Sequence, residues 1–390
     1  MNIVPAVTRL GDLLEVQNGY AFDSKRFSPT SGTPLIRIRD LRGGSSTETR
    51  YDGDFDPKYL VHAGDLLIGM DGEFACYRWT GAPALLNQRV CRLQDFTTDL
   101  LPRYLFYGIN QHLKEIEDAT GYATVKHLSS KTVLDIKMPI PPLARQLRIV
   151  GILDEAFAAI AAARANTEQN LRNARELVGA ATESLFPAVI VGHPGARRLA
   201  ELCDLIVDCE HKTAPTQDRG IPSIRTPNIG KGRLILDGVN RVSDDTYKVW
   251  TRRVEPRAGD LILAREAPAG NVAVIPDGLK VCLGQRTVLL RPNRSVFEPA
   301  YLAHLLLQRD SQRRLLAGQR GATVQHVNVQ DIRAFRVSGV PSLMVQQGVV
   351  QKIDGLLEEG DALEAGFRQK LDALDSLKQS LLHQAFTGAL

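Results

Sequence analysis

One proline-free stretch constrains the fold of this chain more than any other feature. After Pro141 and Pro142 no proline occurs until Pro187, and proline is tolerated only in the first turn of a helix. A helix of about 40 residues would be roughly 60 Å long, so it must pack against a second long helix. Its apolar residues recur at alternating spacings of three and four, the pattern of a coiled coil: Val150, Leu153, Phe157, Ile160, Leu171, Ala174, Val178, Ala181 and Leu185, with Arg164 and Thr167 interrupting them.

The partner is predicted at the C-terminal end of the sequence, from Pro341 to Gly388. An apolar seam of the same kind runs through Ile353, Leu356, Leu363, Phe367, Leu374, Leu377 and Leu381. Ser184-Leu185 recurs in the second copy as Ser380-Leu381, and Asp154 recurs as Asp354. The sequence offset between the two aspartates is larger than the offset between the two Ser-Leu pairs. The difference predicts that the first helix is about one turn longer than the second, an insertion that keeps nearly the same face.

The duplication extends beyond the helices. Landmarks recur in the same order through both halves: Arg9–Leu13 with Arg198–Leu202, Pro34–Arg37 with Pro222–Arg225, Gly64–Ile68 with Gly259–Leu263, Gln88–Val90 with Gln285–Thr287, and Ala123–His127 with Ala322–His326. Such self-similarity indicates two copies of a unit of roughly 195 residues. Each copy would be one globular domain followed by one long helix.

This duplication predicts an α+β chain in four parts. Residues 1–140 and 196–340 would form two similar, strand-rich globular domains, and residues 141–192 and 341–390 would form the helical regions, packed as an antiparallel coiled coil. Strands are expected at Leu35–Arg39, Asp65–Gly69, Arg89–Leu93, Thr132–Ile140, Ile221–Thr226, Asp260–Ala264 and Thr287–Leu290, helices at Leu100–Asp118 and Pro299–Leu316, and a linker at Val191–Gly195. Alternation along Leu35–Arg39 would place Arg37 and Arg39 on one strand face.

Composition excludes several protein classes. Hydrophobic content is 44% and charged content 24%, which is ordinary for a globular protein, and no apolar run reaches the length of a membrane span. Met1–Leu10 has no apolar core, so no signal peptide is expected. The five cysteines form no C-x-x-C pair, which favours neither a zinc site nor a disulfide framework and indicates a reducing cytoplasm.

Motifs for catalysis are missing from the sequence. It has no phosphate-binding glycine loop and no Asn-Pro-Pro-aromatic stretch of a base methyltransferase. Asp208, Glu210 and Lys212 resemble the acidic-plus-lysine set of metal nucleases, but the spacing of the two carboxylates does not suit such a site. The eight histidines are scattered; only His127 and His326 recur. We therefore predict no catalytic residue, metal site or cofactor.

What remains is a set of polar, mostly cationic residues near glycines and turns of both copies. Arginine and lysine bind guanine edges and phosphates, and asparagine and glutamine bind adenine. The alternative is that these are solvated surface charges, because the net charge is only +4. The predicted DNA-binding residues are Lys25, Arg26, Arg37, Arg39, Arg42, Lys126 and His127 in the first copy and His211, Lys212, Thr213, Arg225, Lys231, Arg265, Arg320, Gln325 and His326 in the second, with Arg219 and Arg233 as further cations.

The chain resembles the specificity (S) subunit of type I restriction–modification enzymes over essentially its full length. The residues that carry the resemblance are Gly19–Phe22, Pro34–Arg39, Gly64–Ile68, Thr124–Leu128 and Pro139–Leu143 with Gln146 in the first copy, and Asp208–Thr213, Arg265–Gly270 and Leu283–Arg286 in the second. Each motif is short; their order and duplication make the set specific.

The resemblance implies a non-catalytic subunit with two target recognition domains. Each domain would read one half of a bipartite, asymmetric site on double-stranded DNA, and the helices would fix the gap between the halves. Two methyltransferase subunits would dock on the helical regions, and motor-nuclease subunits could join. Three alternatives stay open: a related restriction–methylation system without a nuclease, an enzyme with its own active site, and a scaffold that binds only protein.

Overall fold

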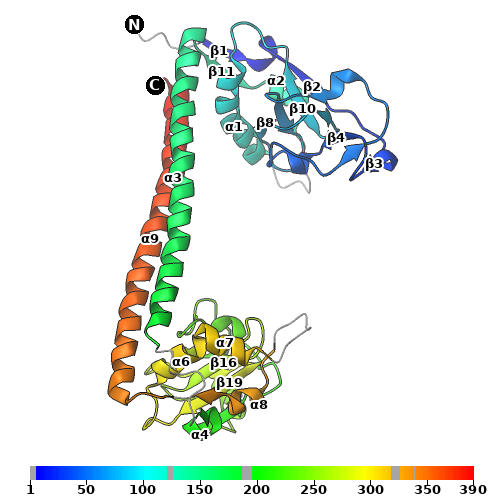
Figure 1. Ribbon diagram of the computed structural model, residues 1–390. Helices are drawn as coiled ribbons and strands as arrows, with labels where there is room; N and C mark the ends of the chain where they lie inside the picture. The colour runs from blue at the N-terminus through cyan, green and yellow to red at the C-terminus, as the bar shows by residue number, and fades with distance from the viewer. Residues whose placement is uncertain (1–5, 121–125, 187–195, 318–325, 338) are drawn as a thin grey trace. The chain divides into compact units, whose positions relative to one another are not determined.

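The computed structural model describes residues 6–120, 126–186, 196–317, 326–337 and 339–390, and it divides into two compact units (Figure 1). Unit 1 comprises Met1–Glu168 with Arg368–Leu390, and unit 2 comprises Gln169–Phe367. Two long helices, α3 (Leu143–Ser184) and α9 (Leu343–Thr387), each contribute one part to each unit. The predicted linker at 191–195 lies outside the described residues, as does the boundary at 192, and the four-part division stays a prediction.

The two long helices pack antiparallel within each unit. In unit 1 the guanidinium of Arg145 donates to the carbonyl of Gly388 at 3.1 Å, near the end of the chain. Deeper along α3, Arg164 pairs with Asp375 at 2.6 Å. In unit 2, Arg175 pairs with Glu364 at 2.8 Å. Residue numbers rise along α3 while those of their partners on α9 fall, so the predicted antiparallel pairing is confirmed.

Two of the predicted seam residues on α9 are wrong. Leu363 and Leu377 are 50% and 47% exposed. The seam passes instead through less apolar positions, which a hydrophobicity pattern does not indicate. One of these is Gly360, where an added Cβ would lie 2.9 Å from Cγ2 of Val178 on α3. On α3 the interrupting Thr167 is buried, and its hydroxyl donates to the carbonyl of Ala163 at 2.7 Å.

The prediction that the first helix is one turn longer is also wrong. Helix α3 has 42 residues and α9 has 45. Phe386, near the end of α9, packs on Tyr104 with ring centroids 5.0 Å apart, and Phe186, just after α3, packs on Tyr301 at 5.2 Å. These two phenylalanines are as far apart in sequence as Asp154 and Asp354, so the two helices keep the same offset along their length. Ser184-Leu185 and Ser380-Leu381 are therefore not structurally equivalent, and no turn is inserted.

The domain of unit 1 is built on an antiparallel sheet in the order β2-β10-β7-β8, and helix α1 (Pro102–Ala119) packs against it. The strands are β2 (Glu15–Asn18), β7 (Leu66–Gly69), β8 (Cys76–Arg78) and β10 (Val90–Gln94). Beside it lie a mixed sheet of β3 (Phe27–Ser28), β5 (Arg50–Tyr51), β4 (Thr33–Ile36), β9 (Ala84–Leu86) and β6 (Leu60–Val61), the pair β1 (Ala6–Arg9) with β11 (Lys137–Ile140), and helix α2 (Ser130–Leu134).

The domain of unit 2 has a sheet of corresponding order, β13-β19-β16-β17. Its strands are β13 (Cys203–Asp208), β16 (Leu261–Ala264), β17 (Val272–Val274) and β19 (Thr287–Pro292). Smaller sheets are formed by β15 (Arg241–Val242), β14 (Ile221–Ile224) and β18 (Cys282–Leu283), and by β12 (Arg197–Arg198) with β20 (Arg336–Val337). The helices are α4 (Leu199–Leu202), α5 (Asp244–Trp250), α6 (Pro299–Leu307), α7 (Arg309–Leu315) and α8 (Val329–Ala334).

Three predicted elements differ from the structure. Strand β4 ends at Ile36 and a 3₁₀ turn, η3 (Ile38–Asp40), follows. Arg37 and Arg39 therefore do not share a strand face. The expected strand Thr132–Ile140 begins as helix α2, because the Ser129 hydroxyl accepts from the Thr132 amide and caps it at 3.0 Å. The expected helix Pro299–Leu316 breaks at Gln308, whose ψ of 147° is not helical.

A buried glutamine ties the start of each long helix to the domain before it. Gln146 accepts from the Leu101 amide at 2.8 Å and donates to the carbonyls of Asp99 and Pro141. Gln346 accepts from the Glu298 amide at 2.9 Å and likewise donates to two carbonyls. Leu101 and Glu298 are the N-cap residues of α1 and α6, so the same joint is built twice. Among the described residues, no helix is long and apolar enough to cross a membrane.

Candidate nucleic-acid interface

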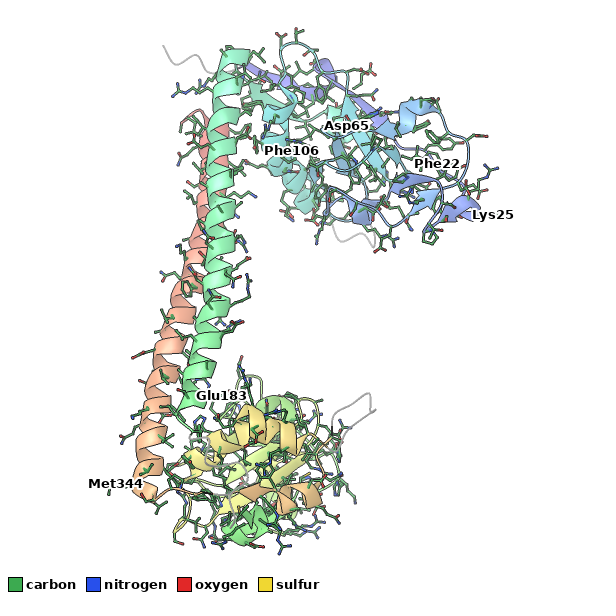
Figure 2. The ribbon with its side chains drawn as sticks, viewed as in Figure 1. Phe22, Lys25, Asp65, Phe106, Glu183 and Met344 are labelled. Carbon is green, nitrogen blue, oxygen red and sulfur yellow. The ribbon has the colours of Figure 1, made fainter. Side chains whose placement is uncertain are left out.

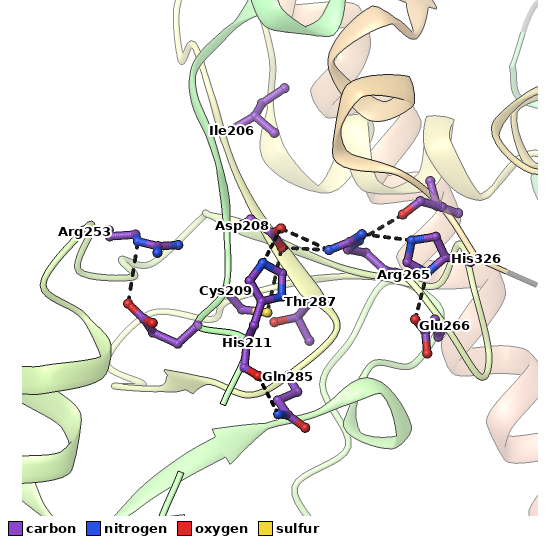
Figure 3. Close-up of polar contacts among 12 residues, drawn as sticks. Ile206, Asp208, Cys209, His211, Arg253, Arg265, Glu266, Gln285, Thr287 and His326 are labelled. Atoms are coloured by element: carbon purple, nitrogen blue, oxygen red, sulfur yellow. Dashed lines mark hydrogen bonds and ion pairs between the residues drawn. The ribbon is translucent and has the colours of Figure 1, made fainter. Parts of the chain in front are cut away.

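A connected polar cluster of unit 2 lies at the ends of β13 and β16 (Figure 3). Asp208 ends β13, and both its carboxylate oxygens accept from Nη1 of Arg265, at 3.1 and 3.0 Å. The same guanidinium contacts Nε2 of His326 at 2.9 Å and donates to the Val327 carbonyl at 3.0 Å. The Arg265 side chain is only 12% exposed. Its guanidinium is thus bound inside the domain, where it links Asp208 to His326.

The outer part of this cluster is formed by three side chains. Glu266 lies 2.8 Å from Nδ1 of His326 and 3.0 Å from the guanidinium of Arg286. The Arg286 side chain is 61% exposed, and its backbone has φ of 65°, a left-handed conformation that residues other than glycine rarely adopt. The carboxylate thus joins a histidine on one side to an exposed arginine on the other.

Unit 1 has the same arrangement with an aspartate. Asp71 lies 2.7 Å from Nδ1 of His127 and 3.3 Å from Nη1 of Arg89. Arg89 is 58% exposed and has φ of 71°. Asp71 and His127 are also joined by an isolated β-bridge, as are Glu266 and His326. The two units therefore present the same acid–histidine–arginine group at corresponding places.

Next to the unit 2 cluster is the loop that carries three predicted contacts. His211 is 68% exposed and lies 3.3 Å from Asp208, while its carbonyl accepts from Gln285 at 3.0 Å. Lys212 and Thr213 are exposed. The loop backbone is thus anchored while its side chains face solvent, an arrangement that suits contact with a duplex.

The predicted cations of unit 1 lie in two places. Lys25 and Arg26 are exposed on the 3₁₀ turn η2 (Ser24–Arg26), which is capped by Asp23; Lys25 projects from the edge of the domain (Figure 2). Arg37 and Arg39 line a groove of about 290 Å³ together with Glu48 and Thr49. All four side chains are at least partly exposed, and Arg39 also contacts Thr49 at 3.4 Å and Asp40 at 3.9 Å.

The remaining predicted residues are less available or are placed elsewhere. Arg42 forms an ion pair with Glu73 that raises the pKa of the guanidinium, and the ammonium of Lys126 donates to the Glu117 carbonyl at 2.6 Å. Arg225 is exposed at the cap of the turn η6 (Thr226–Asn228), and Lys231 is exposed at the rim of a cavity beside α7. Arg320 and Gln325 lie outside the described residues.

Nucleophiles and metal ligands are not gathered anywhere in the part of the chain that the structure describes. All five cysteines are buried and free, and burial raises the pKa of Cys91 to about 12, so this thiol stays protonated near neutral pH. No group of three or more histidine, cysteine, aspartate or glutamate side chains there could hold a metal ion.

Sequence reasoning overlooked Arg89 and Arg286. Both stand in a recurring landmark, Gln88-Arg89 and Gln285-Arg286, which was interpreted only as an element of the repeat. Their acidic partners, Asp71 and Glu266, are far along the sequence, and the left-handed backbone has no local signal when the residue is arginine. Recurrence of an arginine in both copies was the one available indication.

Comparison with known proteins agrees with this picture. The family model described as the type I restriction modification DNA specificity domain matches residues 6–171. The specificity subunit of the type I restriction enzyme EcoBI from Escherichia coli is 28% identical over 98% of this chain and 85% of that subunit. The specificity subunit of MjaVIII from Methanocaldococcus jannaschii is 20% identical over 92% of this chain and 86% of that one.

Solved structures share the fold over the whole chain. A chain from a structure of the assembly and conformational transition of the type I R-M system has a TM-score of 0.72 at 20% identity, covering 99% of this chain and 98% of that one. The HsdS subunit from Thermoanaerobacter tengcongensis has a TM-score of 0.56 at 19% identity, covering 99% and 97%. The resemblance and the fold class predicted from the sequence are confirmed.

Proposed function

The chain belongs to the family of type I restriction–modification DNA specificity subunits, and from this premise we propose how its parts divide the work. Each globular domain reads one half of a bipartite, asymmetric target in double-stranded DNA. The helical pair sets the gap between the halves and docks two methyltransferase subunits, which motor-nuclease subunits could join. The chain itself catalyses nothing, needs no cofactor and acts in the cytoplasm, on the DNA that it recognises.

The observation that carries this proposal is that two domains of one design expose different side chains. Corresponding scaffolds are seen in the glutamine joints and in the acid–histidine–arginine groups. The loops at corresponding places in the two copies differ: unit 1 presents Lys25 and Arg26, whereas unit 2 presents His211, Lys212 and Thr213. Different side chains at base edges select different bases, which supports two half-sites of unlike sequence.

The outer surface of the helices supports protein docking. Leu177 on α3 and Leu363 on α9, both within unit 2, are 69% and 50% exposed, and Met344 at the start of α9 is 81% exposed. Large apolar side chains on a helix exterior suit a protein interface better than solvent. We propose that these leucines belong to the surface on which the methyltransferase subunits dock.

The experiment is DNA binding by the chain assembled with its methyltransferase subunits. We expect the complex to bind a duplex with its methylated sequence at least ~10³-fold more tightly than a random duplex. Equal affinity for both duplexes would favour a protein-binding scaffold. Methyl transfer by the chain alone would favour the enzyme alternative, and a host without the motor-nuclease subunits would point to a methylation-only system.

A further inference from the structure

An arginine in a strained backbone conformation occurs once in each domain, at corresponding positions. Among the described residues, four that are not glycine have positive φ, and two of these are Arg89 and Arg286. Each directly precedes an inner strand of its four-stranded sheet, β10 or β19. An L-residue in this region is strained by contact between its Cβ and the backbone, and such strain is found mainly where the surroundings hold a residue for a functional reason.

The side chains of these arginines are held in place but not covered. One carboxylate, Asp71 or Glu266, binds the arginine at 3.3 or 3.0 Å and at the same time binds a histidine at 2.7 or 2.8 Å. The arginine side chains are 58% and 61% exposed. A guanidinium has five N–H donors, so one carboxylate leaves several of them facing outward.

A second pair of arginines shows what a purely structural role looks like in these domains. Arg92 and Arg291 are 14% and 19% exposed, and each pairs with a carboxylate, Asp65 or Asp260. Both also donate to backbone carbonyls, those of Leu60 and Glu255 among them. Within the described residues, no carbonyl accepts a hydrogen bond from the side chain of Arg89 or Arg286, and both side chains stay exposed. They are therefore poorly explained as internal braces.

We propose that Arg89 and Arg286 make one equivalent phosphate contact in each half-site, with the acid–histidine pair orienting the guanidinium. This rests on the proposed function, in which the two domains read unlike sequences. A group that is the same in both domains cannot supply that difference. It must bind what both half-sites share, and phosphates position a protein on a duplex without carrying sequence.

The test replaces each arginine by asparagine, which tolerates a left-handed backbone and so separates the charge from the turn. Binding of the complex with its methyltransferase subunits is measured against salt, on a target duplex and on a random duplex. Each of Arg89→Asn and Arg286→Asn should lower the slope of log K against log salt by about 0.9, and the double variant by about 1.8. The loss should be the same on both duplexes, and the methylated sequence should not change.

Matched controls are Arg9→Asn and Arg198→Asn, which remove exposed, ion-paired arginines from β1 and β12; they should leave the slope unchanged. An unchanged slope in the test variants, with thermal unfolding as in the wild type, would overturn the inference. So would relaxed preference at a single base pair. If the wild-type complex itself fails to discriminate the target, the proposed function fails instead.

Discussion

The buried amides of Gln146 and Gln346 each close the joint between a long helix and a globular domain. Replacing Gln146 by methionine keeps much of the volume but leaves the Leu101 amide and two carbonyls without a partner. An unsatisfied buried group costs ~1–3 kcal/mol, so Gln146→Met should lower the free energy of unfolding by at least this much in urea denaturation. Gln169→Met, at an exposed site of the same helix, should change the free energy of unfolding by less than ~0.5 kcal/mol. Equal effects of the two substitutions would show that Gln146 does not stabilise this joint.

His304 on α6 should make stability depend on pH. It is buried, and burial lowers the pKa of its imidazole, with Asp354 opposing. The unfolded chain therefore binds the proton more readily, so stability is complete above the unfolded pKa of about 6.5 and is lost as pH falls below it. The free energy of unfolding should drop from pH 7.5 to 5.5 by less in His304→Gln than in wild type. The exposed His383→Gln serves as control and should lose as much stability as the wild type. A loss in His304→Gln identical to that of the wild type would contradict this prediction.

At the residue scale, the sequence indicated positions but not partners. Arg265 was predicted as a DNA contact and is instead enclosed by Asp208, His326 and a carbonyl, because pairing across the sheet has no local signature. His326 was noticed through its recurrence, and the structure adds its bonds to Glu266 and Arg265. Recurrence therefore indicated positions that the two copies share, while exposure and partners required the fold.

At the scale of elements, Gly360 tests the packing of α9 on α3. Alanine is more favourable than glycine in a helix by about 1 kcal/mol, so Gly366→Ala, with no described atom outside its own helix near the new Cβ, should be stabilising by about that amount. Gly360→Ala would bring its Cβ to 2.9 Å from Val178 and should gain less or be destabilising. Thermal unfolding of the two variants makes the comparison, and equal stabilisation would mean that this close approach does not exist.

Helix positions and helix pairing followed from proline spacing and apolar period, which are local properties. The seam of α9 did not, because Gly360 is a contact that no hydrophobicity pattern marks, while Leu363 and Leu377 have the right chemistry on the wrong face. The break at Gln308 was missed for a similar reason. There the side-chain amide of Gln312 donates to the Leu306 carbonyl at 2.7 Å, a contact across the break that no hydrophobicity pattern indicates.

At the scale of the whole molecule, the helical pair should act as a spacer. Because α3 and α9 are antiparallel and Arg164 faces Asp375, residues 161–167 and 372–378 can be deleted together with the seam kept in phase. Seven residues are about 10 Å of helix, or roughly three base pairs. Methylation mapping should show both half-sites unchanged with a shorter gap. An altered base within a half-site, or an unaltered gap, would contradict the proposal that the helices set the spacing.

The division of labour between the domains makes a prediction of its own. Arg225 is exposed on unit 2, so Arg225→Ala should relax base discrimination only within the half-site read by that domain. A lost guanine contact would cost ~1–3 kcal/mol of discrimination. Competition binding with duplexes mutated in one half-site at a time distinguishes the halves. A change confined to the other half-site would be incompatible with this division.

The most direct measurement is genome-wide mapping of methylated bases in cells that carry the methyltransferase subunits, with and without this chain. The account predicts that methylation requires the chain and falls on one bipartite sequence, two unlike half-sites separated by a fixed gap. A methylation pattern that does not depend on the chain would contradict it, as would a single uninterrupted site.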